Sequence, residues 1–268
     1  MQNESNKKYI TLFLLFSFGI PVIYVFLIKS FRVFQSGTPN FILFGIAASA
    51  PTISAFIVTS IVDGYRGHKA FLKKCYRDNL KSSYIVIALL LPTIVLIFAK
   101  LTSLHFVDVT PFITGFSFKK FVIIFWALIA EELGWRGFLQ EKLEKSFGCM
   151  GTPFVLGCIW ALWHSYSFFV GTQSAPMILF VLGCIAESYS YYWLSRKSKG
   201  NCIPASIWHF TGNLWFNLLL INPEHNQGSM APYLFYVIYS IILAVCITIW
   251  GIHSTKKEVV ICSSSSCI

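Results

Sequence analysis

Charged residues are scarce in this chain, because only 12% of its 268 residues are Asp, Glu, Lys or Arg, whereas 56% are hydrophobic. Soluble domains carry about 25% charged residues, so the shortage excludes an ordinary soluble domain. Apolar runs long enough to cross roughly 30 Å of hydrocarbon recur along the whole sequence. They predict an all-α, polytopic membrane protein with about eight transmembrane helices, at residues 9–28, 40–62, 83–102, 120–139, 152–171, 175–195, 201–221 and 232–252.

Other features are missing as well. No small-residue cleavage site follows the first apolar run, which predicts an uncleaved first span. The eight cysteines show neither CxxC spacing nor a secreted disulfide framework. There is no convincing internal repeat, which disfavours a transporter built from repeated halves. No large soluble domain fits between the apolar runs, so residues 1–268 are predicted to form a single integral-membrane domain.

Basic residues give the chain a net charge of +10, but they are unevenly divided between the two predicted sides of the membrane. When loops are assigned to alternate sides, the side of the N-terminus holds fifteen Lys and Arg residues and the other side holds five. The positive-inside rule therefore predicts that both termini are cytoplasmic, and the charge needs no nucleic-acid partner. The amphipathic stretch 63–81 is predicted to be a cytoplasmic interfacial segment beneath anionic headgroups.

Ionisable side chains within the predicted spans are nearly confined to four consecutive helices. Such groups are rare in membranes, usually face the bundle interior and indicate a functional site. Counted at 1.5 Å per residue, those on different helices lie about 12 to 18 Å from the same end of the bundle. We therefore predict one site within a catalytic core at about residues 117–221. Its polar residues are Glu131, Glu132, Arg136, His164, Glu187, His209 and Asn213.

The stretch WALIAEELGWRGFLQ, residues 126–140, contains two adjacent carboxylates. Glu132 and Arg136 are spaced i, i+4, which predicts an ion pair on one helix face. Glu131 is rotated by about 100° from its neighbour and can point elsewhere, where it could take a proton from water as a general base. For these residues alone, an ion network that only packs helices together is an equal alternative.

The histidines also have two interpretations. His164 alone, and His209 with Asn213 at i, i+4, could be interhelical hydrogen-bonding groups. Together with Glu131 they supply a base, a group that positions water, and donors for a developing oxyanion. Glu131, His164 and His209 also make a His₂Glu set suited to Zn²⁺ or another divalent metal. No HExxH helix is present, so the metal stays an open alternative, and no organic cofactor is predicted.

Three motifs in order resemble those of the CAAX protease and bacteriocin-processing family of intramembrane endopeptidases, which includes the type II CAAX prenyl endopeptidases. The resemblance extends from the basic stretch near residue 65 to Asn213. Each motif lies on its own predicted span, so the combination is more specific than any one of them. The motifs are Glu131-Glu132-x-x-x-Arg136, Trp160-x-x-x-His164 and His209-x-x-x-Asn213.

The resemblance implies a role for each motif residue. Glu131 would activate a water molecule that His164 helps to hold, and His209 and Asn213 would stabilise the oxyanion. The ion pair of Glu132 with Arg136 would support this arrangement. The family is described as metalloproteases, although a metal-free glutamate mechanism has also been argued for it.

Two residues stand apart from the family pattern. Trp160 occupies a position where the family usually has phenylalanine, which keeps an aromatic wall but alters its shape. Glu187 matches no motif and is predicted to be a local hydrogen-bond partner.

The resemblance implies a peptide or lipidated-peptide substrate that reaches the site from the membrane or its cytoplasmic side. The short loops suit the plasma membrane of a bacterium or archaeon. Two other functions stay open from the sequence: a non-enzymatic immunity or scaffold protein of the same fold, and a small-molecule transporter that uses the same polar layer.

Overall fold

The computed structural model describes the backbone of residues 2–115 and 117–264, and side chains over 6–115 and 117–251. Within these ranges all regular structure is helical, which confirms the predicted all-α class. The α-helices are α1 (Gln2–Ser30), α2 (Gly37–Ala48), α3 (Ala50–Tyr76), α4 (Ser82–Phe106), α5 (Phe118–Ala130), α6 (Gln140–Trp163), α7 (Ser165–Phe169), α8 (Met177–Lys197), α9 (Ile203–Leu218) and α10 (Ala231–Ser264). A π-helix, η2 (Leu133–Leu139), and two short 3-10 helices, η1 (Arg32–Phe34) and η3 (Pro223–His225), complete the order.

By length and composition, five stretches of described helix can cross a membrane, or six if α2 and α3, which meet at 59°, form one broken span. The chain is thus a polytopic integral membrane protein, but the predicted count of eight spans is not confirmed. The predicted spans 120–139 and 152–171 belong to one helical stretch, Phe118–Phe169, which bends at Gly148 (φ 63°). Helix α9 has only 16 residues, about 24 Å at 1.5 Å per residue, and so falls short of a full crossing.

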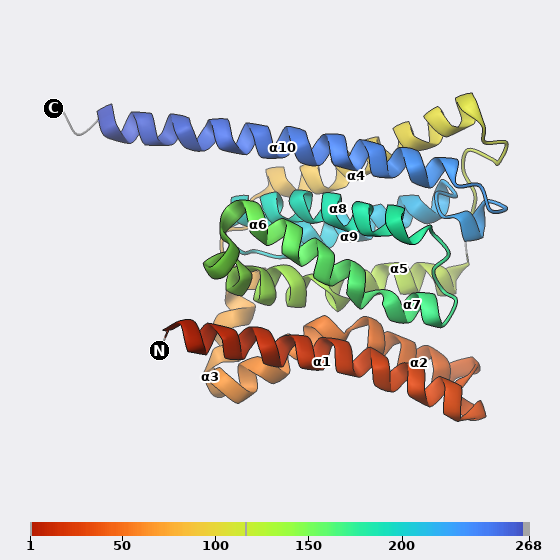
Figure 1. Cartoon of the computed structure of the whole chain (residues 1–268), viewed down its shortest axis with the longest axis horizontal. Helices are drawn as coiled ribbons and strands as arrows, with labels where there is room; N and C mark the ends of the chain where they lie inside the picture. The colour runs from red at the N-terminus through yellow and green to blue at the C-terminus, as the bar shows by residue number, and fades with distance from the viewer. Residues whose placement is uncertain (1, 116, 265–268) are drawn as a thin grey trace.

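The helices run side by side in three groups (Figure 1). Helices α1, α2 and α3 form one side of the bundle, and α4 and α10 form the opposite side. Between them, α8 packs against both α6 and α10, while α9 packs against α4 and α5. This central group contains every residue predicted for the functional site, so the site lies inside the bundle.

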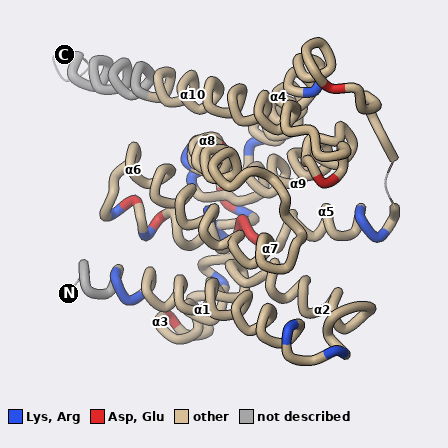
Figure 2. Tube along the Cα trace, turned by 45° about the vertical axis from the view of Figure 1, so that its right-hand side comes forward, with Lys and Arg blue, Asp and Glu red and all other residues tan. Residues whose placement is uncertain are grey.

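Charged residues gather mainly at the ends of the helices, with a few in the interior (Figure 2). Loops that the charge pattern assigns to one side do meet at one end. Lys74 Nζ lies 2.7 Å from Glu141 Oε2, and the Asn201 amide donates to the Asp78 carbonyl at 2.8 Å. Helix α1 also begins at the end of the bundle where α10 ends (Figure 1). That this end faces the cytoplasm stays a prediction.

The predicted interfacial segment 63–81 begins where α3 kinks at Gly64, whose φ of 67° is a conformation that favours glycine. Part of its apolar face packs on protein, because Cys75 is fully buried and the Phe71 ring lies 6.0 Å from that of Phe138 in η2. Tyr65, by contrast, is 90% exposed. The segment therefore braces η2 with one face, and the contact of its basic face with headgroups stays a prediction.

Candidate functional site

The two glutamates stand where the helix changes type. Helix α5 ends at Ala130, Glu131 has non-helical angles (φ −121°, ψ −47°), and the π-helix starts at Leu133. Such π segments are rare and are frequent at functional sites, because the extra residue per turn redirects the side chains around it. Gly134 is required here, since a Cβ on it would lie 2.3 Å from the backbone carbonyl carbon of Pro51 in α3.

Glu132 is held by charged and polar groups and is fully buried. Its Oε1 accepts a hydrogen bond from Arg136 Nη1 at 3.1 Å and lies 3.0 Å from His209 Nδ1. The Arg136 guanidinium carbon also lies 4.1 Å from the centroid of the Tyr191 ring. The ion pair predicted from the i, i+4 spacing is therefore present, and it also fixes the orientation of the His209 ring.

Glu131 has different neighbours from those of Glu132. Its Oε2 accepts hydrogen bonds from the indole N–H groups of Trp160 at 2.8 Å and Trp135 at 3.3 Å. Its Oε1 lies 4.0 Å from His209 Nε2. The Glu131 side chain keeps 11% of its surface exposed, whereas that of Glu132 keeps none. The two carboxylates thus point to different neighbours, as the helix geometry predicts. Glu132 pairs with the Arg136 guanidinium, whereas Glu131 accepts from neutral indole N–H groups.

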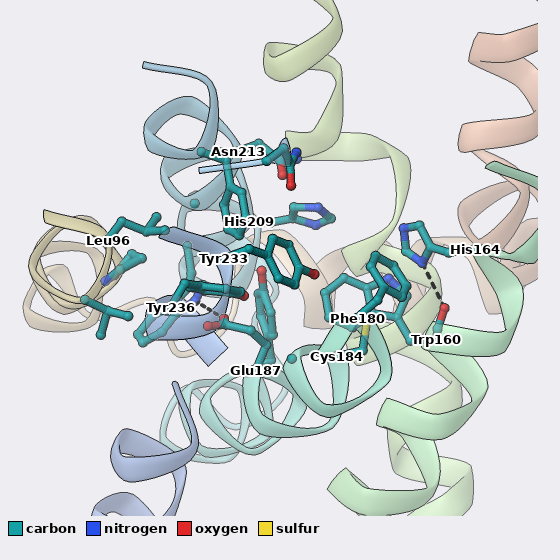
Figure 3. A pocket seen from close by; sticks show the side chains of 18 of the residues that line it. Leu96, Trp160, His164, Phe180, Cys184, Glu187, His209, Asn213, Tyr233 and Tyr236 are labelled. Atoms are coloured by element: carbon teal, nitrogen blue, oxygen red, sulfur yellow. Dashed lines mark hydrogen bonds between the residues drawn. The ribbon is translucent and has the colours of Figure 1, made fainter. Parts of the chain in front are cut away.

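A cavity of about 160 Å³ is lined by Trp160 and His209, which lie close to these carboxylates (Figure 3). His164, directly after α6, and His209, on α9, both line it, and Asn213 follows one turn after His209. His164 Nδ1 lies 2.9 Å from the Trp160 carbonyl oxygen of its own helix, so Nε2 is the ring nitrogen free to meet a ligand. Glu131 is absent from the cavity wall and lies behind Trp160 and His209, which form part of that wall.

Glu187 also lines the cavity, on α8. Its Oε2 accepts from the Trp208 indole at 2.7 Å and its Oε1 from the Ser240 hydroxyl at 3.0 Å. These contacts link α8 to α9 and α10, and they are the local hydrogen bonds predicted for Glu187.

Sequence reasoning missed three side chains that shape the site: Trp135, Tyr191 and Trp208. Trp135 had a local signal, because it follows Glu131 at i+4 and carries a donor that can reach back to a carboxylate. The contact of Tyr191 with Arg136 joins residues of α8 and η2, and it cannot be predicted from the spacing of residues along the sequence.

The His₂Glu set does not fit a metal ion in this arrangement. Within the described part of the chain, no three His, Cys, Asp or Glu side chains are grouped so that they could hold one. His209 Nδ1 contacts Glu132 and Glu131 Oε2 accepts from two indole N–H groups, so Nε2 and Oε1 are the atoms of these two residues that remain, and they lie 4.0 Å apart.

Comparison with known proteins gives two matches. The sequence model of the family described as type II CAAX prenyl endopeptidase Rce1-like matches residues 113–215, a range that contains all three motifs. CAAX prenyl protease 2 of Methanococcus maripaludis is 30% identical over 195 residues, which cover 65% of this chain and 71% of that protein.

Proposed function

The chain belongs to the type II CAAX prenyl endopeptidase family, and on that premise we propose that it hydrolyses a peptide bond within the membrane by means of a water molecule activated by Glu131. The observation that carries the proposal is the state of the Glu131 carboxylate. Among the described residues, none donates a hydrogen bond to its Oε1, while Oε2 accepts two. A carboxylate oxygen without a donor, next to His209 of the cavity wall, is available as a general base.

The gap between Glu131 Oε1 and His209 Nε2 supports a site for water. At 4.0 Å it is too long for a direct hydrogen bond and short enough for one water to contact both atoms. His164 presents Nε2 to the same cavity. These positions support an attacking water near the ends of α5 and α6 and beside α9.

The reaction then follows from these positions. Glu131 Oε1 takes a proton from the water as the water oxygen bonds to the carbonyl carbon of the peptide, and the carbonyl π electrons move to its oxygen. His209 and the Asn213 amide donate to that oxyanion. When the carbonyl re-forms, the C–N bond breaks, and the proton held by Glu131 passes to the leaving amine. No step passes through a metal ion.

The substrate class follows from the family and from the location of the cavity. The relative from Methanococcus maripaludis is named a prenyl protease, and the cavity here lies inside a membrane bundle, among aromatic side chains such as Phe180 and Trp160. We infer a peptide with a prenylated C-terminal motif, which enters from the membrane or its cytoplasmic side. The alternatives, an immunity or scaffold protein and a transporter, predict no cleavage.

The test is cleavage of a fluorogenic farnesylated CAAX peptide by the purified protein in liposomes, beside the same peptide without the prenyl group. We expect the prenylated peptide to be cut by the parent, and Glu131→Gln to abolish cutting. Glu144→Gln is the matched control, since Glu144 pairs with Arg196 at the end of the bundle, away from the cavity. A folded Glu131→Gln variant that cleaves at the parental rate would overturn the proposal.

A further inference from the structure

Trp160 makes a contact that phenylalanine, the residue usual in the family at this position, could not make. Its indole N–H donates to Glu131 Oε2 at 2.8 Å, and a phenyl ring has no donor. Trp135, on η2, donates to the same oxygen at 3.3 Å. The Trp160 indole therefore contacts the carboxylate that is proposed to act as the base.

Both indoles are fixed by packing. Trp160 is 7% exposed, and its ring lies 5.7 Å from that of Tyr191 and 4.8 Å from the guanidinium carbon of Arg136. Trp135 is fully buried, with its ring 5.5 Å from that of Phe13 and 5.7 Å from that of Trp163. Donors held this firmly define the position of the oxygen that they contact.

Two donors on one oxygen make the two carboxylate oxygens inequivalent. Rotation of the carboxylate by half a turn would exchange Oε1 and Oε2, but any intermediate angle breaks both hydrogen bonds. In a water-poor interior such bonds to a charged acceptor are strong. The carboxylate plane is therefore held with one oxygen toward the indoles and the other toward His209 Nε2.

We propose that Trp160, assisted by Trp135, is a positioning residue that holds one oxygen of Glu131 so that the other faces the attacking water. This rests on the proposed role of Glu131 as the base. The indoles are neutral, so they orient the carboxylate without the cation that binds Glu132. Trp160 carries the larger share because its hydrogen bond is shorter by half an ångström.

Kinetics of Trp160→Phe provide the first test. Loss of the hydrogen bond should lower kcat roughly tenfold or more, since bonds to charged groups have about that value. KM should change little, because an aromatic ring still lines the cavity. Trp135→Phe should lower kcat less. A benzothienylalanine at position 160, which keeps the bicyclic ring and lacks the N–H, should behave as Trp160→Phe does. Equal kcat for the parent and both position-160 variants would overturn the proposal.

A spectroscopic test does not depend on activity. The indole ¹H–¹⁵N signals of the protein, assigned by Trp→Phe variants, should include a Trp160 signal that moves when Glu131→Gln removes the charge of its acceptor. Trp208 is the matched control, because its indole donates to Glu187 Oε2 at 2.7 Å. Its signal should move in Glu187→Gln and stay in place in Glu131→Gln. If the Trp160 signal does not shift in Glu131→Gln, while the Trp208 signal does shift in Glu187→Gln, the hydrogen bond from Trp160 to Glu131 would be contradicted.

The two proposals fail in different ways. If Glu131→Gln remains fully active, the proposed function is wrong, whatever the indole signals show. If Glu131→Gln is inactive but Trp160→Phe keeps the parental kcat, only the positioning role of Trp160 is wrong.

Discussion

The Lys100–Asp108 pair and the Glu132–Arg136 pair are both fully buried, yet they differ in how completely their polar atoms are satisfied. Lys100 Nζ donates to Asp108 Oδ2 and to the Thr110 hydroxyl, each at 2.6 Å, and Asp108 also accepts from the Thr110 backbone N–H at 3.0 Å. In the second pair, Glu132 Oε2 and Arg136 Nε are buried without a partner in the described structure.

The difference separates a cluster outside the cavity from one at the proposed site. The first cluster joins the end of α4 to the segment that follows it. Every polar side-chain atom of its ion pair has a hydrogen-bond partner. The second lies at the π-helix, contacts His209, and leaves Glu132 Oε2 and Arg136 Nε without a protein partner among the described residues. Buried polar atoms without a protein partner call for an explanation, and these two lie beside the carboxylate that we propose as the base.

The largest expected effect is on the rate of Glu131→Gln. Loss of a general base costs roughly 10²- to 10⁴-fold in rate, whereas the fold should survive because an amide oxygen can still accept from the two indoles. The measurement is kcat on the farnesylated peptide beside a thermal melt in detergent. If Glu131→Gln lowers the melting temperature strongly as well as kcat, the loss of activity would reflect a structural role of Glu131.

Arg136→Met should reduce both stability and activity. Removing one partner of a buried pair leaves an uncompensated charge, here on Glu132, and costs about 3–5 kcal/mol. Activity should fall as well, even when only the folded fraction is counted, because Glu132 also orients the His209 ring. Melting temperature and kcat per folded molecule are the two readouts. If Arg136→Met melts lower but turns over normally, the pair has no supporting role in catalysis.

Lys100→Met should lower stability to a similar degree and leave kcat per folded molecule unchanged. The reason is the same uncompensated charge, on Asp108, but at a cluster that shares no residue with the cavity wall. The double variant Lys100→Met with Asp108→Leu should recover much of the loss, because replacing both partners by apolar groups is often neutral. A fall in kcat in Lys100→Met, with the folded fraction corrected for, would break the contrast between the two pairs.

How far the sequence predicts this molecule depends on whether a contact is local. The helices, the grouping of Glu131, His164, His209 and Asn213, and the divergence of the adjacent glutamates all follow from hydropathy and helical spacing. The number of spans does not, because hydropathy predicts neither the bend at Gly148 nor the change to a π-helix after Glu132.

Long-range contacts were also beyond prediction. The donation from Trp160 to Glu131 joins residues 29 positions apart on different helices, and only the fold brings them together. The sequence could flag the tryptophan as a departure from the family, but not what its indole would contact. The same limit applies to Tyr191, which stacks on Arg136 from α8.

A smaller effect is expected from pH at the structural pair. Burial by itself would raise the pKa of Asp108, but hydrogen bonds from Lys100 and Thr110 outweigh it and hold that pKa below its ordinary value. A carboxyl with a lower pKa in the folded state adds stability above its unfolded pKa and loses it as the pH falls through the folded pKa. The melting-temperature gap between the parent and Asp108→Asn should therefore be full at pH 7 and shrink below about pH 4. A gap that widens in acid would contradict the sign of this shift.

The smallest expected effect is that of metal removal, which should leave cleavage unchanged. Within the described residues no three His, Cys, Asp or Glu side chains are grouped so that they could hold an ion, and one oxygen of Glu131 already accepts from two indoles. The measurement is the cleavage rate of protein purified without added zinc, before and after a chelator, with metal content determined in both samples. Trp160→Phe sharpens the test, because it frees a lone pair on Glu131 Oε2 and so makes the site more able to accept an ion. If the parent loses its activity with the chelator and regains it with Zn²⁺, the proposed reaction without a metal is wrong, because the water would then need the ion as well as Glu131.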